Sequence, residues 1–194
     1  MQVILSNLTK KFQSKTIFEN FSYTFKCQGI YAIIGDSGVG KTTLLRMIAG
    51  LDTKYSGEIL GGGSKNTSFA FQEYRLFPTI SALENAVIAN GELADATLKQ
   101  RAIDLLSKLG FSENDLTLLP SELSGGMKQR ISLVRAFLRD TPILLLDEPT
   151  KELDETIRKS LYDIIKKESE NRLVIMVSHQ NEDFEELSAQ KVYI

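Results

Sequence analysis

The 194-residue sequence contains no tryptophan, one cysteine, one histidine and four prolines. The single Cys27 excludes an internal disulfide and a zinc site built from cysteines, and it suits a reducing compartment. The longest apolar runs, such as residues 143–146 and 173–177, are far shorter than the roughly 20 residues of a membrane-spanning helix. We therefore expect no direct membrane insertion.

The sequence also lacks a strong charge of either sign. Its 23 basic and 25 acidic side chains give a formal net charge of −2, so no global field attracts nucleic acid or an anionic lipid surface. Residues 1–6 alternate like a strand and lack the charged-then-apolar layout of a secretory signal. We expect a cytoplasmic protein with no nucleic-acid partner. With 42% hydrophobic and 25% charged residues, the composition is that of an ordinary globular domain.

The hydrophobic pattern changes along the chain. Residues 30–34 form an apolar run bounded by glycines, as expected for a strand buried on both faces, and helical spacing follows over 41–50. Helices are then predicted over 82–88, 94–109 and 127–138. Strands over 143–146 and 172–177, with a helix over 154–167 between them, restore the alternation of a parallel sheet. The pattern predicts a helical lobe inserted into an α/β core.

Residues 35–42, GDSGVGKT, match the phosphate-binding loop GxxxxGK[ST] at every fixed position, after a predicted strand and before a predicted helix. The glycines let backbone N–H groups converge on phosphate oxygens, and the helix N-terminus adds a favourable partial charge. Lys41 is expected to bridge the β- and γ-phosphates, and the Thr42 hydroxyl to hold Mg²⁺. A chance glycine-rich turn is the alternative, which the strand and helix around the loop disfavour. The expected phosphate-binding residues are Gly35, Asp36, Ser37, Gly38, Val39, Gly40, Lys41, Thr42 and Thr43.

A second acidic site follows the apolar strand 143–146. Asp147 falls at the carboxyl edge of the predicted sheet, where it can help hold Mg²⁺ directly or through water. Glu148 is placed to polarise an attacking water as a general base. A solvated acidic turn after a core strand is the alternative, but the presence of the phosphate loop favours the catalytic interpretation.

Residues 123–130, LSGGMKQR, place two glycines directly before an amphipathic helix, which exposes its N-terminal amides as a second anion site. Two such helix starts in one chain suggest two copies that meet head to tail, each completing the other's nucleotide site. Taken alone, the motif is better explained by an N-cap serine followed by flexible glycines.

The order of these motifs resembles the ATP-binding cassette (ABC) family over nearly the whole chain. The resemblance implies an α/β fold: a P-loop NTPase core with a mainly parallel sheet, an N-terminal antiparallel β subdomain and an inserted helical subdomain. It implies one domain over 1–194, with its core at about 1–72 and 138–194 and the helical lobe at about 73–137. ATP and Mg²⁺ are the implied ligands.

The resemblance also assigns roles residue by residue. Gln72 is implied to sense Mg²⁺ and the attacking water, alongside the catalytic Lys41, Glu148 and His179. His179 corresponds to the switch histidine that touches the γ-phosphate. Each residue has an alternative: a lone histidine after a core strand is more often structural, and a lone glutamine such as Gln72 is more often a polar strand end. The residues implied to act across a dimer are Ser124, Gly125 and Gly126, which contact the γ-phosphate of the opposite subunit, and Asp154, in the loop that crosses between subunits.

Phe12 lies 29 residues before Lys41 (41 − 12), about where the family places an aromatic side chain that stacks on adenine. Packing in the core is the alternative for this phenylalanine.

Three positions depart from the family pattern. Met127 replaces a glutamine, a variant associated with importers of the nitrate, sulfonate, taurine and thiamine-precursor group. Lys151 and Glu152 replace small residues, a change expected to alter contacts across the dimer and the coupling between its two sites. Gln180 follows His179 where an aspartate is common, a change that bears on the orientation of the histidine.

The resemblance therefore predicts the ATP-hydrolysing motor subunit of a membrane transporter, with import favoured, on the inner face of the cell membrane. Its partners would be a second cassette, identical or related, and a permease docked on the helical lobe near Gln72 to Asn90, where Phe77, Ile80 and Leu83 line a groove. Two alternatives remain: a soluble ABC-type ATPase that acts on a protein or nucleic-acid complex, and a nucleotide-responsive assembly module that does not hydrolyse ATP.

Overall fold

The computed structural model describes residues 2–12, 15–88 and 95–194. In this part of the chain the strands form two sheets, an antiparallel sheet in the order β2-β1-β4 and a parallel sheet in the order β5-β6-β7-β3-β8. The antiparallel strands are β1 (Val3–Phe12), β2 (Lys15–Phe25) and β4 (Ser56–Leu60). The parallel strands are β3 (Gly29–Ile34), β5 (Thr67–Ala70), β6 (Ile143–Asp147), β7 (Leu173–Val177) and β8 (Gln190–Tyr193).

The parallel sheet is apolar on both faces, and successive residues of one strand enter different cores. Leu144 and Leu146 of β6 pack in the cluster formed with the helices, whereas Ile143 and Leu145 pack in the cluster formed with β1, β2 and α1 (Lys41–Ile48). This division follows from the side-chain alternation of a strand. It explains why the sequence of β6 reads as a continuous hydrophobic run instead of an alternating one.

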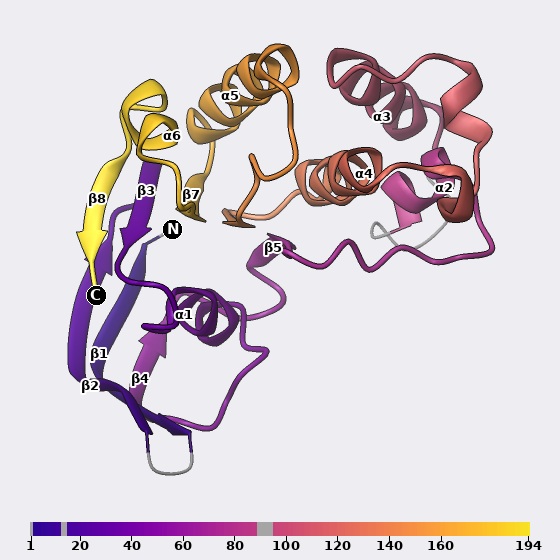
Figure 1. Ribbon diagram of the computed structural model, residues 1–194. Helices are drawn as coiled ribbons and strands as arrows, with labels where there is room; N and C mark the ends of the chain where they lie inside the picture. The colour runs from indigo at the N-terminus through magenta and orange to yellow at the C-terminus, as the bar shows by residue number, and fades with distance from the viewer. Residues whose placement is uncertain (1, 13–14, 89–94) are drawn as a thin grey trace.

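The helices between β5 and β6 gather at one end of the molecule, away from the antiparallel sheet (Figure 1). They are α2 (Ala82–Val87), α3 (Ala96–Lys108) and α4 (Gly125–Leu138), with the 3₁₀ turns η2 (Asn114–Thr117) and η3 (Pro120–Glu122). After β6 come α5 (Glu155–Ser169) and the short α6 (Asn181–Glu186). None of the helices in the described ranges is long and apolar enough to cross a bilayer.

Side-chain caps fix where these helices begin. Ser81 and Glu84 form a reciprocal capping box at α2, and Asp95, Ser124 and Asp154 accept backbone hydrogen bonds at the starts of α3, α4 and α5. Each cap satisfies an amide that the first helical turn leaves unpaired.

The predicted α/β fold is confirmed, including the parallel sheet, the antiparallel β subdomain and the helices inserted between β5 and β6. The hydrophobic pattern did not predict β4 or β8. Strand β4 contains Gly57 at φ +94°, and β8 has one buried residue, Val192, so neither segment carries a strong apolar signal. The predicted start of the second helix, Ala94, lies outside the described residues.

Removing core volume at Leu144 tests this packing. Leu144 is fully buried, so we expect Leu144→Ala to lower the free energy of unfolding by about 2–5 kcal/mol. Leu60→Ala is the control, because Leu60 is 48% exposed and its truncation should change stability by roughly 0.5 kcal/mol or less. Urea unfolding followed by circular dichroism measures both. Equal losses in the two variants would contradict the assignment of the core.

Candidate active site

The parallel register brings three strand ends to one edge of the sheet. Val177, at the end of β7, pairs with Ile33 of β3 on one side and with Asp147 of β6 on the other. These strands are followed by the phosphate loop, by Glu148 and by the Ser178–His179 segment. Gly35 and Glu148, which are 113 residues apart in the chain (148 − 35), therefore lie at the same edge.

The phosphate loop wraps around the ammonium group of Lys41. This side chain is buried, and its Nζ donates to the carbonyl oxygens of Gly35 at 2.8 Å and Asp36 at 3.0 Å. Gly40 caps α1 at φ +119°, where a Cβ would lie only 3.0 Å from the Phe18 ring, so a glycine is required there. The loop thus leaves the first amides of α1 unpaired by any side-chain cap.

Thr42 joins the phosphate loop to the end of β6. Its hydroxyl donates to Asp147 Oδ1 at 3.0 Å. Burial raises the pKa of Asp147, and the hydrogen bond from Thr42 and the nearby charge of Arg46 oppose this rise. The result is two oxygen-bearing groups, one hydroxyl and one carboxyl, held side by side next to the phosphate loop.

Glu148 and His179 face each other across the ends of β6 and β7. His179 Nε2 lies 3.3 Å from Glu148 Oε1, and the backbone N–H of Glu148 donates to Val177 O at 2.9 Å. Glu148 is mostly buried and takes a left-handed backbone conformation at φ +54°, whereas the His179 side chain is 59% exposed. Burial raises the pKa of the Glu148 carboxyl, and His179 opposes the rise.

These groups surround a cleft of about 400 Å³. The cleft brings together most of the residues predicted to bind nucleotide or act in catalysis. Four of the predicted residues at this edge are not among its lining residues: Gly35, Asp36, Val39 and Asp147, the last of which is bonded to the lining residue Thr42. Ile17 and Val177 also line it and were not predicted, because nothing in their local sequence separates them from core strand residues. The lining residues are Phe12, Ile17, Ser37, Gly38, Gly40, Lys41, Thr42, Thr43, Gln72, Glu148, Val177 and His179.

Phe12 is 49% exposed, and the Lys10 ammonium lies 4.5 Å from the centre of its ring. The alternative in which Phe12 is a core residue is therefore wrong. The ring is available at the edge of the cleft.

The glycines of the LSGGMKQR segment lie outside the lining of this cleft. Ser124 caps α4 by accepting from the Met127 amide at 3.2 Å, so the N-cap role is present. A Cβ on Gly125 would approach Glu152 Oε2 to 2.7 Å, so a side chain at this position would displace the carboxylate of Glu152. Asp154 likewise lies outside the cleft lining and caps α5, accepting from Ile157 at 3.0 Å.

The structure shows the contacts of Glu152, Met127 and Gln180, one residue from each of the three departures from the family pattern. Glu152 takes φ +63°, and its carboxylate accepts a 2.8 Å hydrogen bond from the Tyr74 hydroxyl. Met127 packs against the helical core, and the Gln180 amide donates to Ser178 Oγ at 3.0 Å. The Glu152 side chain therefore joins the segment after Gln72 to the start of α4.

Gln129 has a structural part in the site that the sequence did not reveal. It is buried in α4, and its Nε2 donates to the carbonyl oxygens of Glu148 at 2.8 Å and Pro149 at 3.2 Å. The sole sequence signal was its position in the motif at 123–130. This contact fixes α4 to the backbone of the strand end that carries Glu148.

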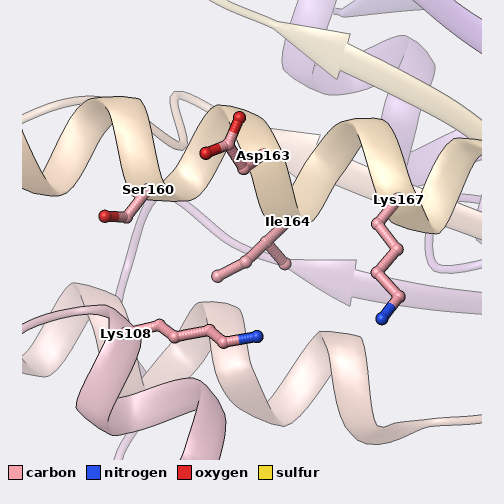
Figure 2. A pocket seen from close by; sticks show the side chains of 5 residues that line it. All are labelled: Lys108, Ser160, Asp163, Ile164 and Lys167. Carbon is pink, nitrogen blue, oxygen red and sulfur yellow. The ribbon is translucent and has the colours of Figure 1, made fainter.

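A separate hollow of about 350 Å³ lies between the end of α3 and α5, lined by Lys108, Ser160, Asp163, Ile164 and Lys167 (Figure 2). Both lysine side chains extend into the space between the helices (Figure 2). It shares no lining residue with the cleft at the phosphate loop.

The parallel sheet, the phosphate loop between β3 and α1, and the acidic end of β6 define a P-loop NTPase core. The sequence profile of the ABC transporter family matches residues 18–151. An aliphatic sulfonates import ATP-binding protein of Bacillus cereus is 36% identical over 194 residues, covering 92% of this chain and 75% of the relative. One from Bacillus subtilis is 38% identical over 175 residues, covering 85% of this chain and 68% of the relative.

Among solved structures, a dimeric ATP-binding cassette in a post-hydrolysis state bound to ADP and Pi matches with a TM-score of 0.85 at 27% identity, covering 99% of this chain and 94% of that chain. This chain belongs to the ABC transporter family and is an ATP-binding, ATP-hydrolysing cassette.

The raised pKa of Glu148 predicts a pH-dependent effect on stability. Because burial moves the folded-state pKa above its ordinary value of 4.5, the folded state holds this proton more tightly, and stability falls as pH rises through the two values. We expect Glu148→Gln to raise the melting temperature at pH 7–8 and to lose this advantage toward pH 4.5. Exposed Glu58→Gln is the control. A pH-independent difference in thermal unfolding would contradict the assignment.

Proposed function

We propose that this chain is the motor subunit of a membrane importer, in which two cassettes bind ATP between them and a separate permease carries the substrate. The cleft carries the proposal: it places Lys41, Gln72, Glu148 and His179 around one space. Import is supported by the aliphatic sulfonates import proteins that the chain resembles. The proposed location is the cytoplasmic face of the membrane, reached through the permease.

Lys41 and the loop amides are proposed to hold the β- and γ-phosphates. In the structure the Lys41 ammonium is satisfied by the Gly35 and Asp36 carbonyls. Phosphate oxygens replace these partners, and the start of α1 supplies further N–H donors. Phe12, exposed at the edge of the cleft, is placed to stack on the adenine ring.

The residues present fit a magnesium ion. Thr42 and Asp147 place two oxygen atoms 3.0 Å apart beside the phosphate loop, and Gln72 lines the same cleft. Mg²⁺ prefers oxygen ligands and is usually held by one or two protein groups together with phosphates and water. We propose Thr42, Asp147 and Gln72 as its protein ligands. When bound, the ion neutralises charge on the β- and γ-phosphates.

Glu148 is proposed as the general base and His179 as the group that stabilises charge on the γ-phosphate. A raised pKa makes the Glu148 carboxylate a better proton acceptor for the attacking water. The exposed His179 imidazole reaches the cleft and can donate to a phosphate oxygen.

Head-to-tail pairing of two cassettes accounts for the residues that do not line the cleft of their own chain. Ser124, Gly125 and Gly126 present the N-terminus of α4, and Asp154 begins α5. We propose that the first three contact the γ-phosphate held by the other copy and that Asp154 lies at the contact between subunits. The matched dimeric cassette supports this arrangement.

The proposed permease-docking surface is a groove of about 330 Å³ between the end of α1, β5 and α4. Its exposed apolar side chains are Leu51 and Phe77, which are 55% and 52% exposed, and Arg75 adds a positive charge. Ile80 and Leu83 do not line it, and Leu83 packs partly against the helical core. Asn90, the far limit of the predicted surface, lies outside the described residues. We propose the helical lobe, at about 73–137, as the part of the single domain that transmits this contact to the core at about 1–72 and 138–194.

Glu148→Gln tests the catalytic assignment. We expect turnover of ATP to fall by roughly 10²–10⁴, the usual contribution of a general base, while nucleotide binding is retained. Phosphate release and binding of a fluorescent ATP analogue measure the two properties, with Glu58→Gln as the control. Full turnover in Glu148→Gln would remove this residue from the mechanism.

Phe77→Ser tests the docking surface. We expect the purified variant to keep its basal ATP hydrolysis, because Phe77 does not line the nucleotide cleft, but to lose its permease. The measurement is capture of tagged chain from its native membranes in mild detergent. Tyr193→Ser, which removes another exposed aromatic ring on β8, is the matched control. A multi-spanning protein recovered equally with both variants would place the docking surface elsewhere, and its absence from the wild-type complex would exclude the transporter role.

A further inference from the structure

Asp183 is a fully buried carboxylate in the first turn of α6, four residues after His179 (183 − 179). It accepts hydrogen bonds from three hydroxyl groups of separate segments: Thr150 at 2.6 Å, Tyr162 at 2.5 Å, and Ser178. A buried carboxylate is costly unless its oxygens are hydrogen-bonded, so these contacts constrain one another.

Two of the three donors flank the reactive pair. Ser178 directly precedes His179, and its hydroxyl oxygen also accepts from the Gln180 amide at 3.0 Å. Thr150 follows Glu148 by two residues (150 − 148). The Asp183 carboxylate therefore bridges the segment that carries the histidine and the segment that carries the glutamate.

The geometry of the pair depends on contacts made by the residues beside it. The His179 side chain is 59% exposed, so packing does little to orient its ring. Glu148 holds φ +54°, a conformation that persists only where surrounding contacts enforce it. Gln129 donates to the carbonyls of Glu148 and Pro149. The next residue, Thr150, is held by the hydrogen bond from its hydroxyl to Asp183.

We propose that Asp183 is a positioning residue that sets the separation of Glu148 and His179 through the Thr150 and Ser178 hydroxyls. Tyr162, on α5, donates to Oδ1 of this carboxylate, whereas Thr150 and Ser178 both donate to Oδ2. The proposal deepens the proposed function and rests on it, because the separation affects turnover only if Glu148 and His179 act on ATP.

Single-hydroxyl variants separate positioning from stability. Ser178→Ala and Tyr162→Phe each remove one buried hydrogen bond to Asp183. We expect both to lower the melting temperature, but only Ser178→Ala to lower kcat about tenfold or more, with the KM for ATP within about twofold. Thr150→Val should resemble Ser178→Ala, and Ser178→Thr, which keeps the hydroxyl, should restore kcat.

His179 is the one histidine in the sequence, so its imidazole resonances report on the pair without any turnover. We expect Ser178→Ala and Asp183→Asn to shift the His179 ¹⁵N and ¹³C signals of the nucleotide-free protein, and Tyr162→Phe to leave them in place. Should Asp183→Asn fail to fold, Ser178→Ala and Thr150→Val carry the test.

Unchanged His179 signals and kcat in Ser178→Ala would overturn the proposal, as would an equal loss of kcat in Tyr162→Phe. Failure of the proposed function has a different signature. Full turnover in Glu148→Gln would overturn the catalytic role of the pair, while the His179 resonances would still decide whether Asp183 sets its geometry.

Discussion

The site depends on the parallel pairing of β7 with β3 on one side and β6 on the other. Because Val177 is in register with both Ile33 and Asp147, the three strands end together at one edge of the sheet. A one-residue change of register would turn the side chains of a strand to its other face and displace the segment that follows. The two apolar cores, one on each side of the sheet, hold this register.

Burial of carboxyl groups at that edge gives the site its electrostatic character. Asp147, Glu148 and Asp183 are all buried, and each has a different partner: the Thr42 hydroxyl, the His179 imidazole and a set of three hydroxyls. Burial raises the pKa of Asp147 and Glu148 because water is kept from the charged form. Keeping these carboxylates charged in a buried site therefore lowers the stability of the fold at the same place where the proposed chemistry occurs.

Helix α4 connects this edge to the proposed docking groove. Gln129 donates to the carbonyl of Glu148, and six residues further along (135 − 129), Arg135 donates to the carbonyls of Arg75 and Asn85 at 2.9 Å. The start of the same helix lies against Glu152, which is bonded to Tyr74. The groove segment and the strand end that carries the proposed general base are therefore hydrogen-bonded to the same helix.

The sequence by itself determined the phosphate loop, the acidic end of β6 and the alternation of strands and helices, because each depends on residues that are neighbours in the chain. The tertiary structure alone decided the exposure of Phe12, the contact of Gln129 with Glu148, and the gathering of Thr150, Tyr162 and Ser178 around Asp183. These contacts join residues from different elements, and hydroxyl or amide side chains have no periodic pattern that identifies their partners. Local sequence fixes which element forms, whereas register and helix packing fix which polar groups meet.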